Sequence, residues 1–256
     1  MENTKSGETS ELSALVAKYS PFIKEVRKRI IFTVSVFAVS TITGFVFYQK
    51  IIKFLINILN LNGINLVFTS PFQYINLAIS CGVAIGLVLV SPLLAYQILS
   101  FLKPALRERE YKMVVGFLPI SAVLFLIGFS FGALVMKWQI EVFLISSTSL
   151  GIGNVLDISK LLSTVVLTSA LMGIGFQFPI ILLLLLRIGI IKHNQLSKQR
   201  LWVYLGSVIF AILLPLDSIL ADVLLAMPLI VLFELTLILD SIFEGSRTKQ
   251  ASQSII

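Results

Sequence analysis

No charged residue lies between Lys53 and Lys103, a run of 49 consecutive positions. A soluble domain cannot accommodate so long an apolar stretch, because each of its buried elements still needs a solvated, charged face. A bilayer imposes the opposite requirement, since each helical crossing needs about 20 mainly apolar residues. Charged residues make up only 13% of the chain, against about a quarter in ordinary soluble proteins. The sequence therefore predicts a membrane protein.

Apolar segments predict an all-α fold, a polytopic membrane protein with six transmembrane helices. Their expected ranges are 30–48, 71–102, 113–136, 161–186, 201–214 and 218–239. Pro92 lies inside the second, which predicts a kinked, tilted helix. Residues 137–160 are expected to form an external loop with an interfacial helix near 140–145. The last two segments are short and adjacent, which predicts a tight final hairpin in locally thinned membrane.

The positions of lysine and arginine predict the orientation. The chain has 20 lysines and arginines. Sixteen of them lie before the first span, in the second and fourth connections, or after the last span. By the positive-inside rule, both termini are expected in the cytoplasm. The expected organisation is a cytoplasmic segment 1–29, a transmembrane domain 30–239 and a cytoplasmic tail 240–256. The basic excess then serves topology and contact with anionic lipids, and no nucleic-acid partner is expected.

Enzyme and metal chemistry find little support in the sequence. The chain contains one histidine, His193, and one cysteine, Cys81, so it holds no His-based metal cluster and no internal disulfide. An intramembrane serine protease would need a histidine within the bilayer, but His193 lies in a basic connection. Asp217 and Asp222 are too sparse for the metal site of a phosphotransferase. No enzymatic activity and no cofactor are expected.

Polar residues at membrane depth are candidates for function. Gln177 lies near the middle of the fourth span, and Glu234 lies near the cytoplasmic end of the sixth. Asp222 lies near the opposite end of that span, and Asp217 lies in the hairpin. For each, a helix–helix hydrogen bond or a cap is the alternative to a functional role. An ion-coupled secondary transporter that uses Glu234 and Asp222 is the alternative function.

Two acidic sites on the predicted cytoplasmic face lie within basic stretches. Glu25 lies among Lys24, Arg27, Lys28 and Arg29, and Glu108 and Glu110 alternate with Arg107 and Arg109. Ordinary surface pairing, such as Glu25 with Arg29 at i,i+4, is one interpretation. The other interpretation is a site for a cationic ligand at the membrane face.

From about Pro21 to Leu239 the chain resembles the TatC family, the polytopic core subunit of the twin-arginine protein translocase. The order and spacing of several blocks carry the resemblance: residues 22–30, which match H-L-x-E-L-R-x-R-L at Glu25, Arg27 and Arg29; residues 91–106, which match P-x-x-x-Y-Q-x-x-x-F-x-x-P-x-L; Glu110; residues 175–179; and Ala226-Met227-Pro228 with Phe233-Glu234. Three positions depart from the family pattern: Phe22 replaces a histidine, Gln177 replaces a glutamate, and Pro215-Leu216-Asp217 replaces Pro-Pro-Asp.

The resemblance implies a receptor that binds twin-arginine signal peptides of folded proteins and nucleates assembly of the translocon. Carried over onto matching positions, it assigns signal-peptide binding to Glu25, Arg27, Pro104, Leu106 and Glu110. It assigns intramembrane polar or partner contacts to Gln177, Asp217 and Glu234. Carboxylates suit this task, because each can accept two parallel hydrogen bonds from a guanidinium.

The resemblance also implies partners and a location. The expected partners are the signal peptides, single-span subunits of the TatA and TatB type, membrane lipids and further copies of this chain. The expected location is the inner (plasma) membrane, with a thylakoid membrane as the alternative.

Overall fold

The computed structural model describes the backbone of residues 2–59, 65–102, 108–150, 155–189, 191, 193–216 and 218–253. Side chains are described within these ranges except at 2–22, 65–66, 99, 101–102, 108–114, 117, 155, 187–188 and 242–253. The elements follow one another as α1 (Glu2–Val46), α2 (Tyr48–Ile58), β1 (Asn65–Val67), α3 (Gln73–Leu102), α4 (Glu108–Ser149), β2 (Val155–Asp157), α5 (Ile158–Gly175), α6 (Phe178–Ile188), α7 (His193–Lys198), α8 (Arg200–Ile212) and α9 (Ile219–Gln253).

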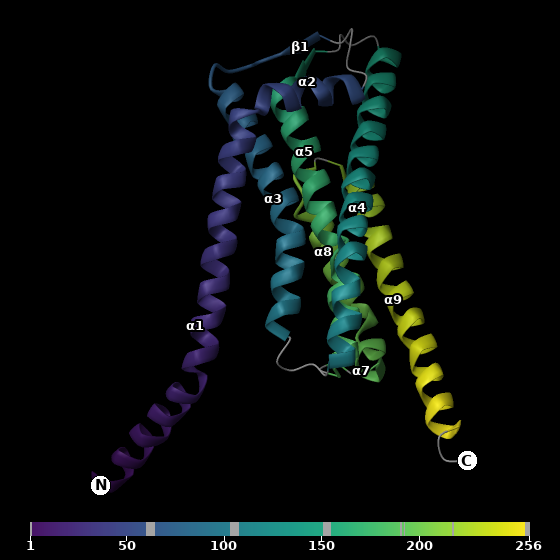
Figure 1. Cartoon of the computed structure of the whole chain (residues 1–256). Coiled ribbons are helices and arrows are strands. Elements are labelled where there is room, and N and C mark those ends of the chain that lie inside the picture. Colours follow the sequence, from purple (N-terminus) through teal and green to yellow (C-terminus); the bar gives the residue numbers. More distant parts are fainter. Residues whose placement is uncertain are drawn as a thin grey trace.

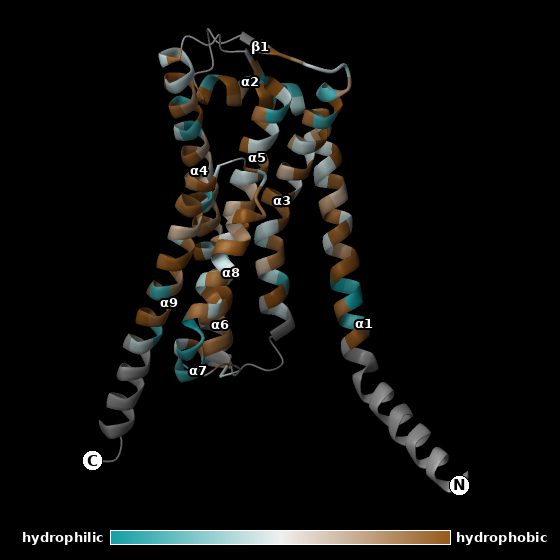
Figure 2. Ribbon diagram, turned by 180° about the vertical axis from the view of Figure 1, so that it is seen from behind, coloured by the Kyte–Doolittle hydropathy of each residue, from teal (hydrophilic) through white to brown (hydrophobic). Residues whose placement is uncertain are grey.

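Five helical segments in the described part are long and apolar enough to cross a membrane. They are Ile23–Val46, Gln73–Ile98, Leu118–Ser149, Ile158–Leu186 and Ile219–Ser241. Hydrophobic residues predominate along most of their length (Figure 2). Val34 on α1, Leu134 on α4 and Val223 on α9, for example, are each about 60% exposed. Such faces suit lipid, where the backbone is satisfied within each helix.

The sixth expected span corresponds to α8, which is apolar but only 13 residues long. At 1.5 Å per residue it measures about 20 Å, against a hydrocarbon core of about 30 Å. The turn that joins α8 to α9 accordingly lies within the length of the bundle and short of α2 (Figure 1). The expected short final hairpin is present, and the count of six spans depends on whether α8 crosses locally thinned membrane.

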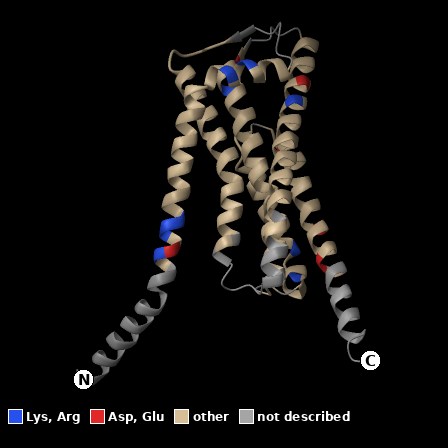
Figure 3. Ribbon diagram, in the orientation of Figure 1, with Lys and Arg blue, Asp and Glu red and all other residues tan. Residues whose placement is uncertain are grey.

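Both ends of the chain lie at the same end of the bundle (Figure 1), here called the terminal end. The opposite end, here called the α2 end, holds α2 and the parallel strands β1 and β2, which pair Leu66 with Leu156. Charged residues of the described part gather toward these two ends (Figure 3). This arrangement is typical of a protein whose middle lies in hydrocarbon.

Helix α1 is held mainly by α3, and the two backbones approach closely. Gly44 and Gly82 lie at this crossing, where a Cβ added to Gly82 would lie 2.7 Å from the carbonyl oxygen of Thr41. A Cβ added to Gly44 would lie 2.9 Å from the Cα of Gly82. Small residues permit such contact between membrane helices, where dispersion forces drive association. The crossing therefore holds α1 against α3 close to the α2 end, where α1 ends at Val46.

The central core joins α4, α5 and α9. Met172 and Leu225 are fully buried, and Val135 and Phe176 are nearly so. A second core lies at the α2 end, where α2 packs one apolar face against α3 and α5. The lysines of α2 lie on its other face, and Lys53 is exposed. Helix α2 thus has the amphipathic pattern of a helix in the membrane interface.

Several expected boundaries were wrong. Helix α4 continues to Ser149, so residues 137–149 are helix and not loop, because no glycine or proline interrupts the chain before Gly151. The fourth segment is broken between α5 and α6 at Phe176–Gln177. Pro179 contributes to the break, since it lacks the N–H that would donate to the carbonyl of Gly175 in a continuous helix. Helices α2 and α7 and both strands were not predicted.

The α1–α3 crossing predicts that Gly82→Ala destabilises the chain. The added methyl group cannot avoid the Thr41 carbonyl without separating the two backbones, a strain of about 2 kcal/mol. Thermal unfolding of the purified chain in detergent should therefore occur at a lower temperature. Gly116→Ala is the matched control, because nothing lies within 4 Å of its added Cβ. Equal melting temperatures for the two variants would contradict this packing.

Candidate functional site

Glu25 lies exposed on α1, near the terminal end of the bundle. Its Oε1 accepts hydrogen bonds from Arg29 Nη2 at 2.6 Å and from Arg29 Nε at 3.2 Å. The i,i+4 pair expected from the sequence is thereby confirmed. Both hydrogen bonds share one acceptor oxygen. The pair is therefore weaker than a bidentate arrangement in which each carboxylate oxygen accepts one hydrogen bond from the guanidinium.

Arg29 also connects α1 to α3. Its Nη1 donates to the backbone carbonyl of Gln97 at 3.1 Å. One turn further along α1, Thr33 Oγ1 donates to Gln97 Oε1 at 2.8 Å. Gln97 lies in the last turns of α3, whose end at Leu102 leads toward α4. The Glu25 carboxylate is therefore positioned, through Arg29, beside the terminal end of α3.

Arg27, the third charged residue of the expected site, is exposed on α1. It lines a shallow surface with four apolar residues, Ile23, Val26, Ile30 and Ile31. Ile23 and Ile30 are each about 60% exposed. An exposed carboxylate and an exposed apolar surface thus lie on the same helix, within two turns of each other.

Four residues of the expected site cannot be placed. Pro104, Leu106 and Asp217 lie outside the described residues, and Glu110 lies in α4 with its side chain outside them. Helix α4 begins at Glu108 at the terminal end (Figure 1). The proximity of Glu110 to Glu25 therefore stays a prediction.

Gln177 is buried at the break between α5 and α6. Its Nε2 donates to the carbonyl of Ser121 at 2.9 Å, and its Oε1 accepts from Ser121 Oγ at 2.6 Å. Ser121 is on α4, so the expected helix–helix hydrogen bond is present. Together with Ser91, the two residues are the polar members of a mainly apolar cavity of about 130 Å³ between α3, α4 and α6. One polar pair therefore lies in the wall of a small apolar cavity.

Glu234 is held by α8. It accepts a hydrogen bond from Tyr204, and its Oε2 lies 3.4 Å from Arg200 Nη1. A similar pair joins α7 to α9, where His193 Nδ1 lies 3.0 Å from Asp240 Oδ2. These contacts fit a helix–helix role for Glu234, the alternative left open by the sequence. Tyr204 and Asp240 were not predicted, because their partners lie 30 and 47 positions away and no local pattern connects them.

Asp157 forms a polar cluster at the α2 end that was also not predicted. Its Oδ2 accepts from Thr69 Oγ1 at 2.8 Å and from Gln73 Nε2 at 2.6 Å, both at the start of α3. Its Oδ1 caps α5 by accepting from the N–H groups of Ser159 and Lys160. Burial raises the pKa of Asp157, but these four hydrogen bonds outweigh burial and hold its pKa below the ordinary value.

No group of three or more His, Cys, Asp or Glu side chains that could hold a metal ion occurs in the described part of the chain. Asp222 also lies alone there, since its buried Oδ1 accepts no hydrogen bond from a described residue. The polar groups of the described part thus form separate small clusters, each joining two or three helices. Such an arrangement can bind and position a ligand.

Comparison with known proteins gives the family. Residues 21–228 match the family model described as Sec-independent protein translocase protein (TatC). The chain belongs to the TatC family. It is therefore a subunit of a protein translocase, a multi-pass membrane protein of a transport system and not a member of a catalytic enzyme family.

Relatives and solved structures agree with the TatC assignment. The chain is 30% identical over 225 residues to the Sec-independent protein translocase protein TatCy of Bacillus subtilis (strain 168), an alignment that covers 85% of this chain and 86% of the relative. It is 31% identical over 161 residues to TatC of Escherichia coli (strain K12), covering 63% and 62%. A crystal structure of the twin arginine translocase receptor TatC matches with a TM-score of 0.76 and 26% identity, covering 86% of this chain and 98% of that one.

The lowered pKa of Asp157 predicts an acid-sensitive α2 end. A carboxylate whose pKa is lower in the folded chain than in the unfolded chain stabilises the fold at pH values above the unfolded-state pKa, which is about 3.9 for aspartate. This stabilisation is lost as the pH falls through the folded-state pKa. Asp157→Asn should therefore lower the melting temperature in detergent at pH 7. It should also flatten the dependence of melting temperature on pH below about 4.

Glu141→Gln is the control for Asp157→Asn, because Glu141 is exposed at the α2 end of α4. It should leave both the melting temperature at pH 7 and its fall in acid unchanged. If Asp157→Asn melts like the unaltered chain across this pH range, the four hydrogen bonds contribute nothing measurable.

Proposed function

We propose that this chain is the receptor subunit of a twin-arginine translocase and binds signal peptides that carry two consecutive arginines. The observation that carries the proposal is that Glu25 already binds a guanidinium, that of Arg29, at an exposed position. The same geometry suits an arginine from outside the chain. The proposed second acidic contact is Glu110, and Arg27, Pro104 and Leu106 are the proposed neighbours.

In the chain without a bound peptide, Arg29 occupies the contact with Glu25 that we propose for a signal-peptide arginine. An incoming guanidinium that uses both oxygens of Glu25 makes a better fork than Arg29, whose two bonds share Oε1. Arg29 retains its bond to the Gln97 carbonyl after the exchange. The exchange therefore leaves neither guanidinium without an acceptor, which keeps its cost low.

The apolar stretch of the signal peptide is proposed to follow the bundle inward from this site. The exposed Ile23, Ile30 and Ile31 provide an apolar surface beside Glu25. The cavity at Gln177 offers a second, deeper apolar contact. The neutral amide of Gln177 requires less desolvation than the carboxylate expected from the family pattern, and Ser121 satisfies it when no peptide is bound.

The remaining assignments complete the proposal. Both termini lie in the cytoplasm, in agreement with the distribution of lysine and arginine. The membrane is the bacterial inner membrane. The exposed apolar faces of the α8–α9 hairpin, with Asp217 and Glu234 at or near its ends, receive single-span subunits of the TatA and TatB type. Further copies of the chain join the same complex, which nucleates the translocon.

Photocrosslinking of a reporter signal peptide tests the proposed function. Changing its Arg-Arg to Lys-Lys should weaken crosslinking to this chain about tenfold, since an ammonium cannot make the paired bonds of a guanidinium. Glu110→Ala should have a similar effect, and Glu108→Ala, its neighbour in the same turn, a smaller one. Unchanged crosslinking of the Lys-Lys peptide would argue for a different function.

The exchange at Glu25 makes a separate prediction. Arg29→Gln removes the resting partner of Glu25, so signal-peptide affinity should rise about two- to fivefold, the value of an exposed ion pair. Lys28→Gln is the control, since it removes an exposed charge from the same helix. Peptide titration by fluorescence anisotropy measures both. An affinity that falls in Arg29→Gln and not in Lys28→Gln would mean that Arg29 supports the site and does not compete for it.

A further inference from the structure

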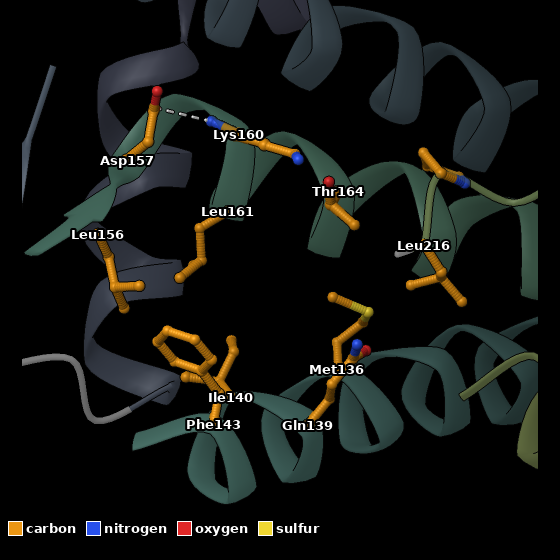
Figure 4. Close-up of a pocket in the computed structure, with 11 residues that line it drawn as sticks. Met136, Gln139, Ile140, Phe143, Leu156, Asp157, Lys160, Leu161, Thr164 and Leu216 are labelled. Carbon is orange, nitrogen blue, oxygen red and sulfur yellow. Dashed lines mark hydrogen bonds between the residues drawn. The ribbon is translucent and has the colours of Figure 1, made fainter. Parts of the chain in front are cut away.

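A cavity of about 320 Å³ lies at the α2 end, between α4, the start of α5 and the α8–α9 turn. Its size is within the range of small-molecule sites, about 300–1,000 Å³. Figure 4 shows that residues from α5 and from α4 face one another across it. It is on the opposite side of the break at Gln177 from the terminal end, so it takes no part in the site proposed above.

One wall of the cavity is polar. Lys160 and Thr164 project from α5, and Gln139 projects toward them from α4 (Figure 4). Gln139 Oε1 is buried and accepts no hydrogen bond from any residue in the described part of the chain. An unsatisfied buried acceptor is costly, so a molecule that donates a hydrogen bond to it is favoured.

The charges of the cavity select a zwitterion. Lys160 already makes an interaction in the structure, but its ammonium carries three N–H donors and can also bind an anionic group. The Asp157 carboxylate, which also lines the cavity, attracts a cationic group. Asp157 already accepts four hydrogen bonds. It therefore attracts a cation electrostatically but does not accept a further hydrogen bond from it. The acceptor for a cationic N–H group is then Gln139 Oε1.

The other wall is apolar and opens toward the outside of the bundle. Met136, Ile140 and Leu216 line it, together with Phe143, whose side chain is 50% exposed. Helix α8 ends at Ile212, and Pro215 and Leu216 of the following turn form the floor of the cavity. An acyl chain can therefore leave the cavity along Phe143 into the outer surface of α4.

We infer that this cavity binds the headgroup of a phospholipid with a primary ammonium group. The phosphate lies at Lys160 and Thr164, the ammonium donates to Gln139 Oε1 in the field of Asp157, and one acyl chain follows Phe143. The bilayer supplies such lipids at high local concentration. The bound lipid fills the space above the short hairpin and joins α4 to α5 at the α2 end.

Native mass spectrometry of the delipidated full chain in detergent tests this inference. Phosphatidylethanolamine should bind about tenfold more tightly than phosphatidylcholine, which lacks the N–H donors, or phosphatidylglycerol, which lacks the cation. Gln139→Met, similar in shape but apolar, should abolish the preference over phosphatidylcholine. Lys160→Gln, at an exposed residue, should weaken binding of phosphatidylethanolamine and of phosphatidylcholine alike. Lys53→Gln, an exposed lysine of α2 at the same end, should change nothing.

Two further probes separate the possible sources of the headgroup. Inorganic phosphate and glycerophosphoethanolamine, which has no acyl chains, should not compete with the lipid at equal concentration. Competition by either would overturn the lipid assignment in favour of a site for a small anion or zwitterion. Equal binding of the three lipids, or equal losses in Lys53→Gln and Lys160→Gln, would overturn the site itself. If the Gln139→Met chain does not fold, the comparison of lipid binding between Lys160→Gln and Lys53→Gln decides whether the site exists.

Discussion

Backbone amides and carbonyls in hydrocarbon must find their hydrogen-bond partners within the protein. The long helices of this chain satisfy that requirement through most of their length, and polar side chains gather where a helix is interrupted. Gln177, at the break before Pro179, is joined to Ser121 of the neighbouring helix. Asp157 caps α5 with one oxygen and holds the start of α3 with the other. These two interruptions therefore each create a polar site and determine which helices that site connects.

The short hairpin follows from the same constraint. Helix α8 ends after 13 residues, and the α8–α9 turn packs against α4 and α5 inside the length of the bundle. Leu214 anchors that turn in the central core, while Leu213 and Ile219 on either side of it are exposed. One consequence is a hollow at the α2 end that no helix fills. A lipid with a polar headgroup suits this hollow, because its lining combines the polar Gln139, Lys160 and Thr164 with apolar side chains.

The sequence predicted the helices well and their ends poorly. Uncharged runs are sufficient to locate α3 and α5 with α6, since few other structures tolerate them. The extension of α4 through Lys137 and Glu141 was missed because charge was equated with loop, although a helix can carry charge beyond the hydrocarbon. The Glu25–Arg29 pair was predictable because it is local. The Arg29–Gln97 and Thr69–Asp157 contacts join positions 68 and 88 apart, and no periodicity in the sequence reveals them.

The resting pair at Glu25 also bears on how a receptor can distinguish arginine from lysine. An exposed ion pair contributes at most about 1 kcal/mol, so Arg29 occupies the carboxylate without blocking it. In the proposed exchange, a guanidinium from a peptide would replace Arg29 with two bonds for two, and would gain by using both carboxylate oxygens. An ammonium offers no planar fork and would displace Arg29 for a less favourable geometry. On this proposal, selectivity at Glu25 would come from the difference between these two exchanges, because a lysine-bearing peptide would gain less than it must displace.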